Sequence, residues 1–222
     1  METQKQKQIV KLIPKSIKQE EYIEMLSDWG KSVVIATGPA GTGKTLLAVL
    51  AGIKALKNND VKKLIITRPA VEVDGEKHGF LPGDLTQKLM PWCIPIFDVL
   101  KEYYSIAQVT KLLADEVIEL APLSMMRGRT FKDAWVILDE SQNVSPSQLL
   151  MFLTRIGDDT KMIITGDLNQ TDRSFHKENS GLIDFFKRLD GHDSNMIVRV
   201  DFDKSDIQRH PLVTEVLSLY EN

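Results

Sequence analysis

The residues Gly38 to Thr45, with the sequence GPAGTGKT, have the types and spacing of a phosphate-binding loop. They lie between an apolar run and a helical pattern, as the P-loop pattern G-x-x-x-x-G-K-S/T requires. Glycines let backbone N–H groups turn towards phosphates, and a helix N-terminus attracts anions. We expect Lys44 to reach the β- and γ-phosphates of ATP, and Thr45 to bind Mg²⁺. A plain glycine-rich turn is the alternative, which the flanking strand and helix disfavour. The predicted nucleotide-binding residues are Gly38, Pro39, Ala40, Gly41, Thr42, Gly43, Lys44 and Thr45.

Two acids follow another apolar run, Trp135 to Leu138, and form a Walker B pattern. Asp139 is expected to hold Mg²⁺, while Glu140, which points differently, would orient or deprotonate the attacking water. An acidic turn at a strand end is the alternative, and it is common in α/β proteins. The P-loop in the same chain favours the catalytic interpretation.

A third polar group follows the run that ends at Thr165. Gly166 and Asp167 lie at the carboxyl end of this predicted strand, where ligands bind in open α/β sheets. The amide of Gln170 is placed to sense the γ-phosphate. A Gly-Asp pair after a strand is more often a simple turn. The two other motifs favour the functional interpretation.

These groups depend on short aliphatic runs that predict strands. The runs are continuous rather than alternating, which is typical of strands buried on both faces. Helical patterns lie between several of them, and this alternation predicts an α/β fold with a parallel sheet and helices on both faces. Residues 68–83 carry prolines and glycines and predict a long loop. The strands are expected at 33–36, 64–67, 117–120, 135–138, 162–165 and 196–200, and the helices at 44–57, 84–104 with interruptions, 146–156, 181–190 and 204–221.

Composition favours a single globular domain over residues 1–222. The chain is 42% hydrophobic and 27% charged, which is ordinary for a protein with its own core. A net charge of −3 argues against binding to nucleic acid through an overall positive charge of the protein. The single Cys93 cannot form an internal disulfide, and no run approaches the length of a membrane span. We expect a cytoplasmic protein that does not bind membranes.

With these motifs, the chain resembles the PhoH family of phosphate-starvation-inducible ATPases, which is similar to the first motor domain of superfamily 1 helicases. The resemblance covers nearly all of the chain. It rests on GPAGTGKT at 38–45, Thr67-Arg68-Pro69, Phe80-Leu81-Pro82-Gly83-Asp84, Arg127-Gly128-Arg129-Thr130, Asp139-Glu140-Ser141-Gln142-Asn143, Thr165-Gly166-Asp167 with Gln170, and Arg209-His210-Pro211.

The resemblance implies a three-layer P-loop NTPase fold of the RecA and helicase kind. In it, the strand that ends at Thr165 lies between those that end at Thr37 and Leu138, and Gln170 faces the γ-phosphate. It also implies that Gln19 reads the adenine edge; a solvated helix residue is the alternative. Ser141 replaces an expected alanine, and residues 171–174 replace an expected Asp-Leu-Pro.

The resemblance further implies a shared active site. Helicases of this superfamily receive an arginine from a second motor domain, which we do not expect in this chain. We therefore expect a homo-oligomeric ring, a hexamer, in which a neighbour completes each site. Arg209 is the first candidate for the catalytic finger, with a structural ion pair as its alternative; the others are Arg127, Arg129 and Arg155.

Nucleic acid is the partner that the helicase likeness implies. Arg68, at a strand end, resembles a helicase residue that contacts single strands, and Arg127 and Arg129 would line the same channel. Surface ion pairing is the alternative for each. The sequence thus predicts an oligomeric Mg²⁺-dependent ATPase that acts on single-stranded RNA or DNA.

Two other functions stay open. The first is a nucleotide-switched scaffold with little turnover, because a motor that lacks half its parts can evolve into a switch. The second is a small-molecule kinase, which Glu140 disfavours because its place suits water activation. The four histidines lack metal-ligand spacing.

Overall fold

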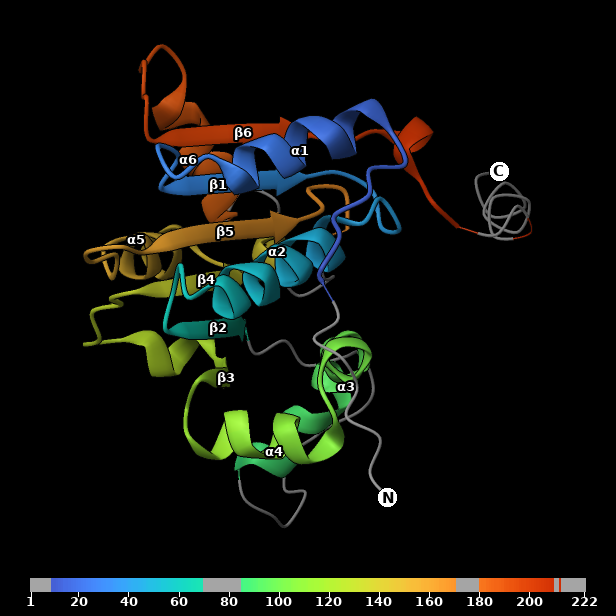
Figure 1. Ribbon diagram of the computed structural model, residues 1–222. Helices are drawn as coiled ribbons and strands as arrows, with labels where there is room; N and C mark the ends of the chain where they lie inside the picture. The colour runs from blue at the N-terminus through green and yellow to red at the C-terminus, as the bar shows by residue number, and fades with distance from the viewer. Residues whose placement is uncertain (1–8, 70–84, 171–179, 210–211, 213–222) are drawn as a thin grey trace.

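A computed structural model describes residues 9–69, 85–170, 180–209 and 212 of the chain. These residues form a six-stranded sheet in which every strand pairs in parallel, in the order β3-β2-β4-β5-β1-β6. The carboxyl ends of all strands therefore meet at one edge (Figure 1). The strand that ends near Thr165 lies between the P-loop strand and the Walker B strand, as the resemblance implied.

The six predicted strands are confirmed, with ends that differ by no more than two residues. The four strands at the centre, β2, β4, β5 and β1, are almost wholly buried, which accounts for their continuous apolar runs. The strands are β1 (Val33–Thr37), β2 (Lys63–Arg68), β3 (Ile118–Pro122), β4 (Ala134–Leu138), β5 (Lys161–Gly166) and β6 (Ile197–Asp201).

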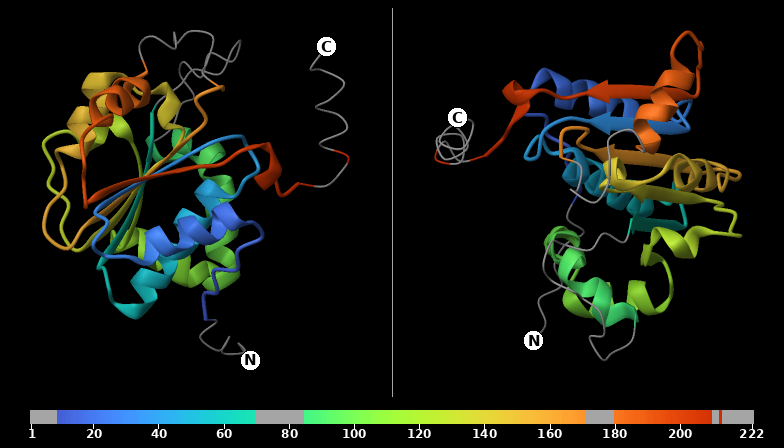
Figure 2. Two further views of the ribbon diagram at one scale, coloured as in Figure 1. Left: turned by 90° about the horizontal axis from the view of Figure 1, so that it is seen from above. Right: turned by 180° about the vertical axis from the view of Figure 1, so that it is seen from behind.

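Helices cover both faces of the sheet and give the predicted three layers (Figure 2). One face carries α1 (Ile17–Ser27), α2 (Lys44–Asn58), α3 (Leu85–Tyr103) and α4 (Ile106–Ala114). The other carries α5 (Pro146–Leu153) and α6 (Gly181–Leu189).

Alternating side chains of each strand supply the two cores. In β1, Val34 and Ala36 join the core beneath α1 and α2, whereas Val33 and Ile35 join the core beneath α5 and α6. This division arises because successive side chains of a strand point to opposite faces of the sheet. Each layer therefore buries its own apolar surface, and the sheet edge stays available for polar groups.

The prediction of a helix over 204–221 is wrong at its start. A short 3₁₀ turn covers Lys204–Asp206, where Asp203 caps the turn by accepting from the Ser205 backbone at 2.7 Å. The chain then leaves helical geometry, because the backbone N–H of Gln208 donates to the carbonyl of Gly41 at 2.9 Å. Residues 207–209 thus lie against the P-loop instead of continuing a helix. Residues 210–211 and 213–221 of the predicted helix lie outside the described residues.

Two further helices differ from the predicted pattern. Helix α1 was not predicted from periodicity; Ser16 caps it, with its hydroxyl accepting from the Gln19 backbone. Helix α3 runs without interruption to Tyr103, and a capping box at Ser105 starts α4 as a separate element. The predicted loop 68–83 lies, from residue 70 onward, outside the described residues.

Trp135 joins the Walker B strand to the P-loop helix. Its buried indole N–H donates to the Ala48 carbonyl of α2 at 3.1 Å. A Cβ added at Gly52 would meet the Trp135 ring at 2.7 Å, so the helix approaches the strand closely only where glycine stands. Through this contact β4 and α2 keep a fixed separation.

Replacing Trp135 with Phe removes this hydrogen bond and part of the buried volume. We expect the free energy of unfolding in urea to fall by about 1–3 kcal/mol. Trp29→Phe is the matched control, because Trp29 is 45% exposed and should change stability by less than about 0.5 kcal/mol. Equal losses in both variants would contradict this role.

Candidate functional site

The carboxyl ends of β4 and β5 meet the start of α2 at one carboxylate. Asp139 Oδ1 accepts a hydrogen bond from the Thr45 hydroxyl at 2.8 Å and another from the Thr165 hydroxyl at 2.6 Å. Asp139 itself is buried. The structure thus brings together the predicted metal residues Thr45 and Asp139, which are far apart in sequence.

These oxygens fit a magnesium ion. Mg²⁺ prefers oxygen ligands and is held by few protein groups together with phosphates and water. Thr45 and Asp139 supply a hydroxyl and a carboxylate within hydrogen-bond distance of each other. In the described part of the chain, no cluster of three or more His, Cys, Asp or Glu residues forms a metal site by itself.

The P-loop turns where glycine is required. Gly38 has φ of 139°, and a Cβ there would lie 2.4 Å from the carbonyl oxygen of Phe202, which follows β6. The N–H of Gly38 donates to the carbonyl of Gly166 at 3.2 Å. The loop is therefore held between the ends of β5 and β6.

Lys44 lies over the P-loop backbone. Its ammonium donates to the carbonyls of Gly38 at 2.6 Å and Pro39 at 2.7 Å, and to the Thr42 hydroxyl at 3.1 Å. Burial lowers the pKa of Lys44, and the acids of the site, Asp167 first, oppose that shift. A phosphate oxygen would take the place of one of these acceptors.

Glu140 combines an unusual backbone with two side-chain partners. Its φ of 55° and ψ of 38° lie in the left-handed region, a cost of order 1–3 kcal/mol for a residue other than glycine. One carboxylate oxygen accepts from Arg68 at 2.7 Å, and the other accepts from Gln142 at 2.6 Å. Strained backbone of this kind persists where the surroundings fix it, and it is concentrated at active sites.

Gln142 connects this acid to the end of β5. Its buried amide also donates to the carbonyl of Gln170 at 3.2 Å and accepts from the backbone N–H of Asp167 at 3.1 Å. A Cβ at Gly166 would meet the hydroxyl of Ser141 at 2.7 Å, so glycine allows the two segments to approach. The predicted sensor Gln170 is exposed and lines the pocket.

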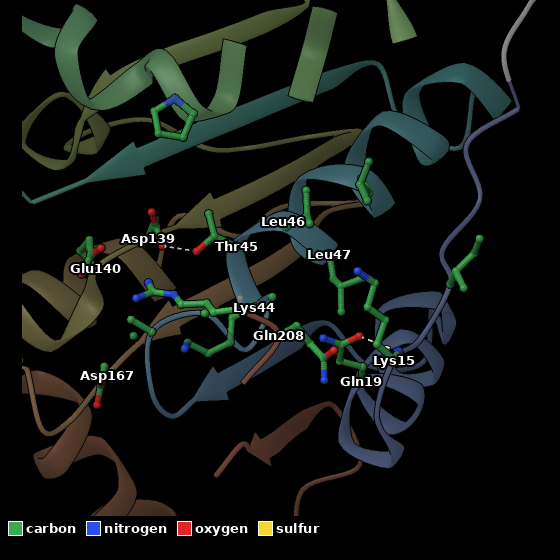
Figure 3. Close-up of a pocket in the computed structure, with 18 of the residues that line it drawn as sticks. Lys15, Gln19, Lys44, Thr45, Leu46, Leu47, Asp139, Glu140, Asp167 and Gln208 are labelled. Atoms are coloured by element: carbon green, nitrogen blue, oxygen red, sulfur yellow. Dashed lines mark hydrogen bonds between the residues drawn. The ribbon is translucent and has the colours of Figure 1, made fainter. Parts of the chain in front are cut away.

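A pocket of about 680 Å³ opens over these residues (Figure 3). One end holds the charged groups Lys44, Asp139, Glu140 and Asp167. Leu46, Leu47, Gln19 and Lys15 lie on the side away from these acids (Figure 3). The apolar residues Ile13, Leu50 and Pro95 also line the pocket. The volume and the division suit a nucleotide, with phosphates at the charged end.

Gln19 lies beneath the P-loop and is only 4% exposed, so the alternative of a solvated helix residue is wrong. Its amide nitrogen donates to the Thr42 carbonyl at 2.9 Å, and its amide oxygen accepts from the Lys15 backbone at 2.8 Å (Figure 3). These bonds give Gln19 a part in supporting the loop. The prediction that it reads adenine stays a prediction.

The predicted arginines lie in different surroundings. Arg129 makes a two-pronged ion pair with Glu119, so the structural alternative fits it. Arg155 donates to the carbonyls of Met151 at 3.1 Å and Arg129 at 3.3 Å, at the end of α5. Arg127 is exposed, and Arg68 donates to the carboxylate of Glu140. Their contact with nucleic acid stays a prediction.

Arg209 lies against the P-loop of its own chain. A Cβ added at Gly41 would be 2.5 Å from its Nε atom, and the side chain lines the pocket. The bond from the Gln208 N–H to the Gly41 carbonyl holds the segment there. The prediction that Arg209 acts as a catalytic finger or contacts the γ-phosphate stays a prediction.

Comparison with known proteins gives the same assignment as the motifs. The model of the PhoH-like protein family matches residues 11–221. The chain belongs to this family. The PhoH-like protein of Bacillus subtilis (strain 168) is 46% identical over 207 residues, which are 93% of this chain and 63% of that protein. The PhoH-like protein of Synechocystis sp. is 44% identical over 210 residues, 93% of this chain and 61% of that protein.

The chain therefore spans less than two thirds of these PhoH relatives. Among solved structures, a Sulfolobus solfataricus SWI2/SNF2 ATPase core in complex with dsDNA covers 91% of this chain and 49% of its own, at 15% identity and a TM-score of 0.47. That likeness is too low to carry an argument about function. Within the described part of the chain, none of the helices is long and apolar enough to cross a bilayer.

Two residues of this PhoH site were missed as functional by the sequence analysis. Gln142 was quoted only as part of a motif, and Ser141 only as a neutral replacement. The buried hydroxyl of Ser141 donates to the Thr165 carbonyl at 2.7 Å, which ties the Walker B turn to β5. No local pattern reveals these contacts, because their partners are more than 20 residues away.

Ser141→Ala should lower the free energy of unfolding by about 1 kcal/mol, because a buried hydrogen bond is lost. Nucleotide binding should be retained, since the change leaves the side chains of Thr45 and Asp139 in place. Ser27→Ala is the matched control; its hydroxyl makes the same kind of bond, to the Ile23 carbonyl, on an exposed surface. A loss no larger than that of the control, measured by urea denaturation, would contradict a buried tie.

Proposed function

We propose that this protein binds ATP with Mg²⁺ and hydrolyses the γ-phosphate. The observation that carries the proposal is the hydrogen bond of 2.8 Å between the Thr45 hydroxyl and the Asp139 carboxylate, at the end of a pocket that also holds Lys44 and Glu140. Two oxygens suited to Mg²⁺, a phosphate-binding lysine and a carboxylate for water are what phosphoryl transfer to water requires.

Each residue has a separate task in this mechanism. The P-loop N–H groups and the start of α2 bind the phosphates, and Lys44 neutralises charge on the transferred group. Thr45 and Asp139 would hold the Mg²⁺, which supplies further charge neutralisation when it is bound. Glu140 orients the attacking water and accepts its proton. Gln170 would register the γ-phosphate from the loop after β5.

Hydrolysis is favoured over the two alternative functions. A kinase needs an acceptor pocket, whereas the acid beside this P-loop is a Walker B glutamate within the same pocket. A scaffold without turnover has no need for a glutamate in a strained backbone conformation. The strain therefore supports chemistry at Glu140.

Lys44→Ala should abolish nucleotide binding and phosphate release, because the loop loses the cation that neutralises the phosphates. Glu140→Gln should keep binding and lower kcat by about 10²- to 10⁴-fold, the usual contribution of a general base. Phosphate release and nucleotide binding are measured side by side. Lys54→Ala, an exposed position on the same helix, serves as the control. Phosphate release by Lys44→Ala at the wild-type rate would overturn the proposal.

We also propose that the protein acts as a homo-oligomeric ring, a hexamer, in which a neighbour supplies an arginine. Among the described arginines, Arg127 and Arg209 have no hydrogen bond or ion pair with another described residue. Arg209 already lies in its own site. Arg127 is therefore the better candidate for a finger that reaches the next subunit.

Subunit mixing separates the two arginines. Arg127→Ala alone should reduce kcat by about 10³- to 10⁵-fold, the effect of a missing finger. Mixed with Lys44→Ala subunits it should recover activity, because some interfaces join an intact P-loop to an intact Arg127. Arg209→Ala with Lys44→Ala should recover none, because both changes affect the same site. The reverse pattern would exchange the two roles.

Single-stranded RNA or DNA is the partner that we propose for this ATPase. The support is the resemblance of its motifs to helicase motifs, together with Arg68 at the carboxyl end of β2 and Arg127 beyond the carboxyl end of the neighbouring β3. Arg129 gives less support, because Glu119 occupies its guanidinium.

A further inference from the structure

The carboxylate of Glu140 is restrained at both of its oxygens. Arg68 donates to Oε1 at 2.7 Å, and Gln142 donates to Oε2 at 2.6 Å. The two partners differ in kind: Gln142 is buried and also bonded to Asp167 and Gln170, whereas Arg68 is 23% exposed and Glu140 is 42% exposed. The Arg68 contact is therefore the one that solvent and solutes reach.

The sheet makes this contact unavoidable. Strands β2 and β4 are neighbours, and Thr67 pairs with Leu138, so the next residue of each strand, Arg68 and Asp139, emerge side by side. The backbone N–H of Asp139 donates to the Thr67 carbonyl at 2.9 Å and extends the pairing. Arg68 Nε lies 3.6 Å from Asp139 Oδ2, so one guanidinium faces both Walker B acids.

This arrangement conflicts with the task of Glu140. A general base must offer a lone pair within hydrogen-bond reach of the water. Here one lone pair of each carboxylate oxygen is already occupied, and the bond from Arg68 to Oε1 is charge-assisted. Glu140 is thus positioned by Arg68 in an arrangement that opposes water activation.

We propose that Arg68 is a positioning residue that holds Glu140 at rest, and that a backbone phosphate of a bound single strand draws the guanidinium away and frees the carboxylate. Arginine forms two-pronged hydrogen bonds with phosphate as readily as with carboxylate, so the two anions compete for it. The proposal rests on the proposed ATPase function. Binding of the strand would then directly change the rate of ATP hydrolysis, because it frees Glu140 for the water.

The test measures phosphate release by the wild type, Arg68→Ala and Arg68→Lys with saturating ATP and Mg²⁺, each with and without a uridine oligonucleotide. We expect Arg68→Ala to raise kcat without the strand by roughly 2- to 10-fold, the worth of one partly exposed ion pair, with KM little changed. The strand should stimulate the wild type and no longer stimulate Arg68→Ala. Arg68→Lys keeps the charge but not the two-pronged guanidinium, so its kcat and its stimulation by the strand should lie between those of the wild type and Arg68→Ala. If Arg68 had only a structural role, Arg68→Ala would lower kcat and Arg68→Lys would not restore it.

Arg188→Ala is the control for the loss of a surface arginine. Arg188 lies on α6 in an exposed pair with Asp184, and its removal should change neither the basal rate nor the stimulation. A fall of kcat in Arg68→Ala would mean that Arg68 meets the nucleotide's own phosphate, and this result, like an unchanged kcat, would overturn the proposal. The ATPase function fails separately, if the wild type and Lys44→Ala release phosphate equally under every condition.

Discussion

The Asp139 carboxylate is the point on which this structure depends. Two hydroxyls from different elements, Thr45 at the start of α2 and Thr165 near the end of β5, donate to the same oxygen. Both bonds form only if β5 lies between β1 and β4, because the P-loop follows β1 and the carboxylate follows β4. The strand order is therefore a condition of the site, and the apolar faces of the sheet serve to maintain it.

Close backbone approach is the second condition. The P-loop passes within contact of the chain after β6, and the chain after β5 passes within contact of the Walker B turn. Gly38 and Gly166 stand at these two places, where a Cβ would overlap its neighbours. The site is consequently formed from main-chain segments as much as from side chains, which is suited to binding phosphates through N–H groups.

Charge at the site is balanced within the chain itself. Arg68, Lys44 and Arg209 lie among Asp139, Glu140 and Asp167, and these acids offset part of the burial cost that lowers the pKa of Lys44. A bound nucleotide would add negative charge to the site, so the contacts between these cations and acids would have to change. Lys44 and Arg68 donate to carbonyl and carboxylate oxygens, which are acceptors of the kind that a phosphate also offers.

The sequence by itself determined the strands, the sheet class and the nucleotide motifs. Continuous apolar runs and GPAGTGKT are local signals, since burial on both faces and phosphate binding each constrain neighbouring residues. Only the tertiary structure decided what the long side chains touch. The partners of Arg68, Arg209 and Gln19 depend on strand order, on register and on a crossing segment, all set by residues far away in the chain. The helix predicted from residue 204 likewise does not form over residues 207–209, where the backbone of Gln208 bonds to Gly41, a contact far away in the chain.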